Sequence, residues 1–188
     1  MAETKLKTQA MNSGITLTSP IISGAGGTTA GQYGFDATDK SILIGDGSAN
    51  KVIHVADWKT WTPSWTNLTV GNATNAGYYA LIGKTVIFRI KLIFGTTSSM
   101  GSSPYFALPV AAKNYGAGVN RIAEVVYRDT GTAYYAGTVY MGTGGTLGSL
   151  WIYNAGGSYV GYTDPAATTP FTWANTDEIS IQGFYEAA

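Results

Sequence analysis

Short runs of alternating apolar and polar residues, separated by turn residues, fill most of this chain and constrain its fold more than any other feature. The clearest run is TVIFRIKLIF, residues 85–94. Because successive side chains of a strand point to opposite faces, this run places one continuous apolar face on one side. That face consists of Val86, Phe88, Ile90, Leu92 and Phe94. The run therefore predicts a strand that covers a core.

Several further runs have the same character and no helical period interrupts them. Turn residues such as Gly, Asn and Asp separate them at intervals of roughly 8–12 residues. Such spacing favours an all-β fold, an antiparallel β-sandwich of jelly-roll-like type, over a parallel α/β fold. The expected strands are residues 67–71, 78–83, 105–110, 121–129, 132–142, 149–154 and 177–186.

The first third of the chain differs from the rest. Residues 1–30 are polar or glycine-rich and are expected to form an N-terminal arm, with a weak strand pattern at 15–22. For residues 1–14 a disordered terminus is an equally good interpretation. The stretch GQYGFDATDKSILIGDGSANKVIHV (31–55) predicts a small β-meander, which forms a stem over residues 31–57. Two or three strands alone are marginal in water, so the stem must stack on a neighbouring element or pair with copies of itself. Of the two, we expect pairing with other copies of the chain. The main domain is expected to span residues 58–188.

Two groups of apolar side chains bear on packing. Trp58, Trp61 and Trp65 lie within eight residues at the start of the main domain and are expected to plug its core rather than to form a ligand platform. Ile87 and Ile93 point away from the core face of their strand, and together with the tyrosines they predict outward apolar patches. Patches of this kind are usually buried against a partner, which also favours a homo-oligomer.

Composition excludes several classes of function. The 11 basic residues balance the 11 acidic ones, so nucleic-acid binding is not expected. No apolar run approaches the roughly 18 residues that a membrane span requires, so no membrane insertion is expected. The chain has no cysteine, which excludes disulfides and thiolate metal sites.

Residues suited to catalysis are few. The single histidine, His54, lies in a strand-like run without a partner motif. Asp177 and Glu178 are adjacent, so on a strand they point to opposite faces, and nothing in the sequence brings Glu124 and Glu186 together. We therefore expect no enzyme, no catalytic residues, no metal and no cofactor. A small glycoside hydrolase, which needs two facing carboxylates, is the weakest of three hypotheses.

A binding surface is better supported, because Tyr and Trp among Ser, Gly and Asn suit contacts with carbohydrate and protein. Thirteen Tyr and five Trp are present, and one loop-rich region, residues 153–177, is rich in them. The candidate ligand-binding residues there are Tyr153, Tyr159, Tyr162 and Trp173. Equally, these side chains could fill the end of the sandwich or a subunit interface. A carbohydrate-binding module is thus the second functional hypothesis.

The run WTPSWTNLTVGNATNAGYYALIGKTVIFRIKLIFGTTSSMGSSPYFALPVAA (61–112) and the ending PFTWANTDEISIQGFYEAA (170–188) resemble the C-terminal domain of tailed-bacteriophage tail, fibre and minor structural proteins. The segment GQYGFDATDKSILIGDGSANKVI is similar to the β-rich lead-in of phage fibres. The resemblance implies a homotrimer with a wound stem and an exposed β-sandwich head, and it carries no catalytic residues.

From this resemblance we expect a virion structural protein, made in the cytoplasm of a bacterial host. Its form would be a short trimeric fibre or spike, or a capsid decoration protein. The arm would dock on other virion proteins of the capsid or tail. The head would decorate the particle or attach to a glycan of the host surface.

Overall fold

The computed structural model describes residues 33–36, 41–45, 50–54, 57–114, 116, 120–142 and 144–188. Contacts divide the chain between Val55 and Ala56 into two compact units, close to the boundary expected at residue 58. The expected arm of residues 1–30, with its strand pattern at 15–22, lies outside the described residues.

The first unit contains a three-stranded antiparallel sheet in the order β1-β2-β3. Its strands are Tyr33–Asp36, Ser41–Gly45 and Asn50–His54, and they coincide with the apolar runs of the meander. Association of this sheet with copies of itself stays a prediction.

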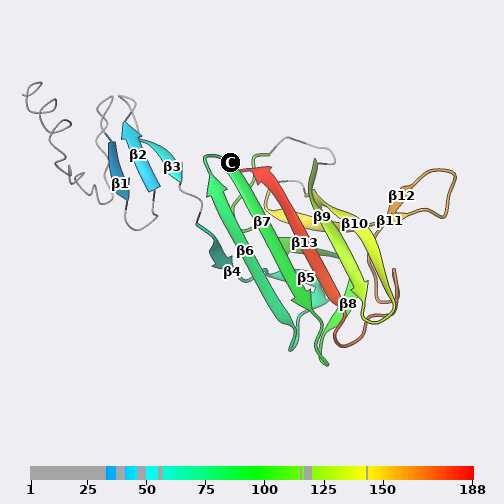
Figure 1. Cartoon of the computed structure of the whole chain (residues 1–188). Coiled ribbons are helices and arrows are strands. Elements are labelled where there is room, and N and C mark those ends of the chain that lie inside the picture. The colour runs from blue at the N-terminus through cyan, green and yellow to red at the C-terminus, as the bar shows by residue number, and fades with distance from the viewer. Residues whose placement is uncertain are drawn as a thin grey trace, which may run out of the picture. The chain divides into compact units, whose positions relative to one another are not determined.

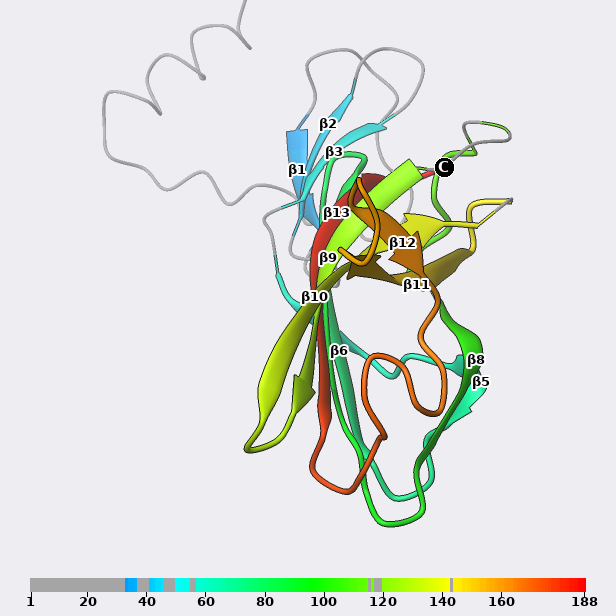
Figure 2. The same cartoon turned by 90° about the vertical axis from the view of Figure 1, so that its right-hand side faces the viewer.

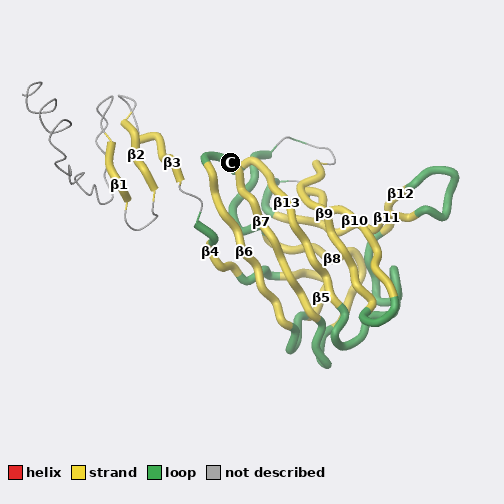
Figure 3. The backbone as a smooth tube through the Cα atoms, in the orientation of Figure 1, coloured by secondary structure: helices red, strands yellow, loops and turns green. Residues whose placement is uncertain are grey.

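The second unit is a single ten-stranded antiparallel sheet. Its order is β4-β6-β7-β13-β9-β10-β11-β8-β5, and β12 pairs with β11 outside this path. Strands make up all of the regular structure in the described part of the unit (Figure 3). The strands are β4 Lys59–Trp61, β5 Trp65–Thr69, β6 Thr74–Ile82, β7 Thr85–Ile93, β8 Ser99–Ala107, β9 Asn120–Asp129, β10 Ala133–Met141, β11 Leu147–Asn154, β12 Gly161–Thr163 and β13 Glu178–Glu186.

The sheet curls so that its two halves face each other across a shared core (Figures 1 and 2). Phe88 of β7 lies 6.2 Å from Phe106 of β8, ring centre to ring centre, although the two strands are far apart in the sheet order. Trp61 contacts both rings, at 6.4 and 6.3 Å. These contacts make the unit an all-β, antiparallel, sandwich-like fold, as the turn spacing predicted.

Strand β7 confirms the alternation read from TVIFRIKLIF. Val86, Phe88, Ile90 and Leu92 are buried and the residues between them are exposed. Ile87 remains 37% exposed on the outer face. The β6–β7 turn uses Gly83 at φ 59°, a conformation that glycine adopts without steric cost. Residues two apart in a strand therefore lie on the same face. One face is buried in the core, and the candidate site is built on the other.

Several strands begin earlier than their apolar runs indicate, and the difference is largest for β6 and β8. Strand β8 also ends at Ala107, so residues 108–110 of the expected strand lie outside it. Strand β6 includes residues 74–77, because they pair with residues 90–93 of β7. The Asn75 amide also donates a 2.8 Å hydrogen bond to the Pro63 carbonyl and accepts a 3.1 Å bond from the Trp65 indole. Strand β8 begins at Ser99 and contains Pro104, which lies where the β5–β8 pairing shifts register. Proline is tolerated at such an irregularity because no ladder hydrogen bond is lost.

The three early tryptophans divide between core and surface. Trp61 and Trp65 pack against the core, as expected for a plug. Trp58 is exposed, and the guanidinium carbon of Arg89 lies 4.7 Å from its ring centre. Only two of the three rings therefore fill the core.

Candidate functional site: an aromatic row on strands β10 to β12

The outer face of strands β10 to β12 carries a contiguous group of aromatic side chains. On β11, Leu150 and Ile152 are buried in the core, so alternation directs Trp151 and Tyr153 outward. Tyr162 of β12 is the direct cross-strand partner of Tyr153. Cross-strand neighbours on one face lie close enough for their side chains to touch.

The rings form a chain of contacts that we call the aromatic row: Tyr140, Trp151, Tyr162 and Tyr153. Successive ring centres are 4.1, 5.0 and 5.5 Å apart, with interplanar angles of 39°, 33° and 42°. The rings are therefore fanned rather than fully stacked. Tyr162, in the middle, keeps 48% of its surface exposed, so a ligand can reach the row.

A fixed polar group borders the row at Tyr153. Arg121 of β9 donates hydrogen bonds from Nη2 to the Tyr153 hydroxyl at 2.7 Å and to Glu124 Oε1 at 2.6 Å. Its Nε donates to Thr138 Oγ1 at 3.0 Å. Three partners thus hold the guanidinium in place, and the exposed Glu124 carboxylate offsets its charge. Donors and acceptors for a hydroxylated ligand therefore lie beside an apolar surface.

A buried tyrosine on the core side of the sheet holds the backbone of the row in place. Tyr127 is fully buried, and its hydroxyl donates a 3.3 Å hydrogen bond to the Trp151 carbonyl. Burial, with a smaller contribution from the negative charge of Asp164, raises the pKa of Tyr127 well above its usual value. The phenol stays neutral and anchors the backbone of β11 beneath Trp151.

The structure brings together two of the four candidate ligand-binding residues, Tyr153 and Tyr162. Tyr159 lies on the loop between β11 and β12 and is 89% exposed, without a ring contact to another described residue. Trp173 lies elsewhere: its ring stacks on Phe94 at 4.8 Å and meets Phe171 at 4.5 Å in a tilted contact. Its indole donates a hydrogen bond to the Ala166 carbonyl. For Trp173 the alternative reading, a side chain that fills the end of the sandwich, describes the observed packing.

Sequence reasoning missed Tyr140, Trp151 and Arg121. The alternation within SLWIYN could have indicated that Trp151 and Tyr153 share a face. Tyr140 of β10 and Arg121 of β9 come close to the row because β10 pairs with both β11 and β9. No local sequence pattern reveals these pairings.

The adjacent carboxylates Asp177 and Glu178 have separate structural roles. Asp177 is buried and accepts hydrogen bonds from the backbone N–H groups of Ala174 and Thr130, at 2.6 and 3.0 Å. Glu178 accepts from Lys91 at 2.9 Å and from Arg128 at 2.8 Å. The hydrogen bond from Lys91 is the main cause that lowers the pKa of Glu178.

The other two glutamates of this unit pair with different cations, Glu124 with Arg121 and Glu186 with Lys113. Within the described ranges, no three His, Asp or Glu side chains gather closely enough to hold a metal ion. In the same ranges, no α-helix is long and apolar enough to cross a bilayer.

Comparisons with protein-family models, with curated proteins and with solved structures gave no match to this chain.

Proposed function

We propose that this chain is a bacteriophage virion structural protein whose second unit, residues 56–188, is a non-catalytic attachment head. The head binds a glycan of the host surface through the aromatic row. The observation that carries the proposal is the row itself: four fanned rings with a fixed polar border on the outer face of a rigid sheet.

The chemistry of the row suits a sugar. The C–H faces of a sugar ring pack against aromatic surface, while its hydroxyls need nearby hydrogen-bond donors and acceptors. The Tyr153 hydroxyl, Arg121 and Glu124 supply both kinds at the edge of the row. All of these side chains stand on strands, which hold a site more precisely than loops do.

The position of the row supports an attachment role. The chain enters this unit at β4, and Figure 1 shows β4 and β12 on opposite sides of the unit. The sheet order agrees, because six strands separate β4 from β12. If this unit is attached to the particle at its β4 end, the aromatic row lies on the opposite side and can face the host surface.

The virion setting is supported by the resemblance of residues 61–112 and 170–188 to phage fibre and tail proteins. In this setting residues 1–30 dock on capsid or tail proteins, and residues 31–57 join three copies as a stem. The small size of the β1–β3 sheet favours such pairing.

A carbohydrate-binding module without a virion role is the second candidate, since the same row would serve it. The association state distinguishes the two: a virion fibre or decoration protein is expected to be a trimer, whereas a free binding module is expected to be a monomer.

The proposal is tested by binding of the full chain to an array of bacterial envelope polysaccharides. The wild type should bind at least one of them, and Tyr162→Ala should weaken that binding about tenfold or more, as loss of a central aromatic contact does. Tyr134→Ala is the matched control, because Tyr134 is an exposed tyrosine of β10 outside the row. Equal losses in both variants, or no binding by the wild type, would remove the proposal.

A further inference from the structure

Strands β13 and β9 separate at one end of the sheet. Their pairing runs from Glu178↔Arg128 to Gly183↔Ala123 and goes no further. Beyond that point β13 continues beside β7 as far as Glu186, while β9 continues beside β10 as far as Asn120. A register shift between Val139 and Tyr140 marks the place where β9 and β10 bend, as a β-bulge does.

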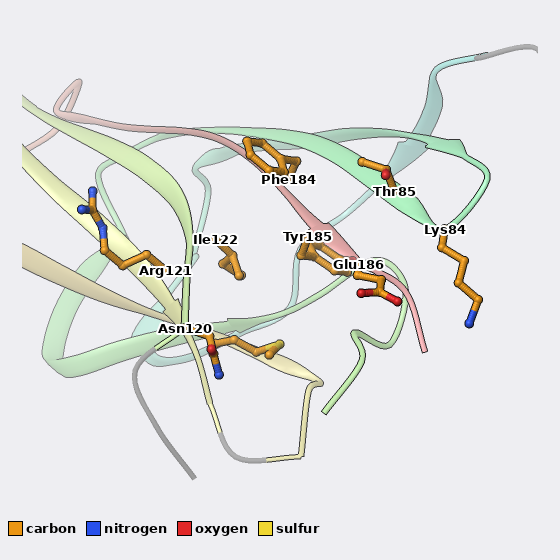
Figure 4. Close-up of a pocket in the computed structure, with 9 residues that line it drawn as sticks. Lys84, Thr85, Asn120, Arg121, Ile122, Phe184, Tyr185 and Glu186 are labelled. Carbon is orange, nitrogen blue, oxygen red and sulfur yellow. The ribbon is translucent and has the colours of Figure 1, made fainter. Parts of the chain in front are cut away.

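The separation leaves a cleft with a volume of about 590 Å³, which lies within the range of ligand pockets in proteins. Figure 4 shows Phe184, Tyr185 and Glu186 of β13 along one wall, with Asn120, Arg121 and Ile122 of β9 opposite them. Lys84 of the β6–β7 turn, Thr85 of β7 and Met141 of β10 complete the lining. The walls thus combine apolar side chains with amide, ammonium and carboxylate groups.

Phe184 is the main apolar group at the rim. It points to the outer face of β13, because Ile181 and Tyr185 on the same strand are buried, and 69% of its surface is exposed. Aromatic side chains commonly line ligand sites, and the exposed ring of Phe184 is available for such a contact.

The cleft and the aromatic row are continuous through Arg121. This residue lines the cleft, and it also lines a smaller hollow of about 280 Å³ together with Glu124 and Phe184. The same guanidinium donates to the Tyr153 hydroxyl at the end of the row. One path therefore leads from Tyr162 over Tyr153 and Arg121 to Phe184.

The length of this path sets the size of the ligand. From β12 to β13 it spans four neighbouring-strand intervals, at least about 19 Å. A single sugar ring cannot cover it. Two cationic side chains, Arg121 and Lys84, and two anionic ones, Glu124 and Glu186, line the path, so their charges sum to zero and do not favour an acidic ligand.

We propose that the cleft between β13 and β9 is a second subsite for the ligand of the aromatic row, and that this ligand is a neutral oligosaccharide several sugar units long. This inference rests on the proposed function, since the row supplies the first subsite. Phe184 packs against a distal sugar ring, and Lys84 and Asn120 donate hydrogen bonds to its hydroxyls.

The test uses fragments of two and of six sugar units, prepared from the neutral envelope polysaccharide that the full-length chain binds best. Calorimetry should show the six-unit fragment binding at least tenfold more tightly than the two-unit fragment. Phe184→Ala should reduce this ratio below about threefold and leave binding of the two-unit fragment unchanged. Val126→Ala is the control, because Val126 is also exposed on β9 but does not line the cleft.

The outcomes separate the two proposals. A six-unit fragment that binds no more tightly than the two-unit fragment, or that binds Phe184→Ala as tightly as the wild type, overturns the second subsite and leaves the row in place. Binding only of acidic polysaccharides overturns the ligand class. Absence of binding to any polysaccharide overturns both the subsite and the proposed function. An unchanged thermal midpoint of Phe184→Ala confirms that the variant is folded.

Discussion

Glu178 shows how one side chain joins three strands of the sheet. Its carboxylate stands on β13 and accepts hydrogen bonds from Lys91 of β7 and Arg128 of β9, the two strands that flank β13. The side chain is only 14% exposed, so solvent screens these bonds less than it would on an open surface. The lowered pKa of Glu178 reflects the same contacts.

Replacement of Glu178 by Gln should lower the free energy of unfolding by about 1–2 kcal/mol at pH 7, less than for fully buried bonds to a charged group, because Lys91 and Arg128 are partly exposed. Because the pKa of Glu178 is lower in the folded state, its stabilisation is full above the unfolded-state pKa and is lost as pH falls through the folded-state value. Urea unfolding should therefore show a difference between wild type and variant that shrinks below about pH 4. A difference that grows in acid would contradict this reading, and Glu124→Gln, with its exposed pair, should change stability by less than about 0.5 kcal/mol.

Gly137 is required by close packing rather than by a turn. A Cβ at this position of β10 would overlap the Trp151 carbonyl oxygen and lie 2.9 Å from the Tyr127 ring. Gly137→Ala should therefore destabilise the protein by about 1–3 kcal/mol, as overpacking does, and disturb the aromatic row. Gly161→Ala is the control, because a Cβ there meets open space. Equal thermal midpoints for the two variants would show that the close packing around residue 137 does not affect stability.

At the scale of elements, alternation predicted β7 and β13 closely, because each of them has one buried face of its own. It indicated only parts of β6 and β8, where burial alternates less regularly. Strands β4 and β12 have three residues each. They are strands because they pair with β6 and β11, and their own residues do not predict them. The same limit applies to the site. Tyr153 and Tyr162 meet through cross-strand register, and Arg121 reaches Tyr153 from β9, so only the tertiary fold brings them together.

The start of β13 depends on Asp177. Its carboxylate joins the loop at Ala174 to the β9–β10 turn at Thr130, while its backbone carbonyl accepts from Phe94. Asp177→Ala should remove the carboxylate partner of these two N–H groups, which belong to exposed residues, and lower the free energy of unfolding by about 1–2 kcal/mol. Asp129→Asn is the control, since that carboxylate makes no side-chain hydrogen bond within the described residues. If chemical denaturation gives equal stabilities, the carboxylate does not anchor β13.

At the scale of the whole molecule, the chain combines a small sheet with a large one that has its own core. The small sheet has three strands, too few to be strongly stable in isolation. We expect three copies to complete it. Light scattering on the full-length chain should then give about three times the mass of 19.7 kDa, and a monodisperse monomer would contradict the proposed stem.

The most direct measurement of the proposed attachment role is a crystal structure of the full-length chain with an oligosaccharide bound. Sugar density should lie on the outer face of β11 and β12, against Tyr162 and Tyr153, with a hydroxyl hydrogen-bonded to Arg121 or Glu124. Density confined to a surface that excludes these strands, such as the region around Trp58 and Tyr78, would contradict the assignment of the aromatic row as the binding site.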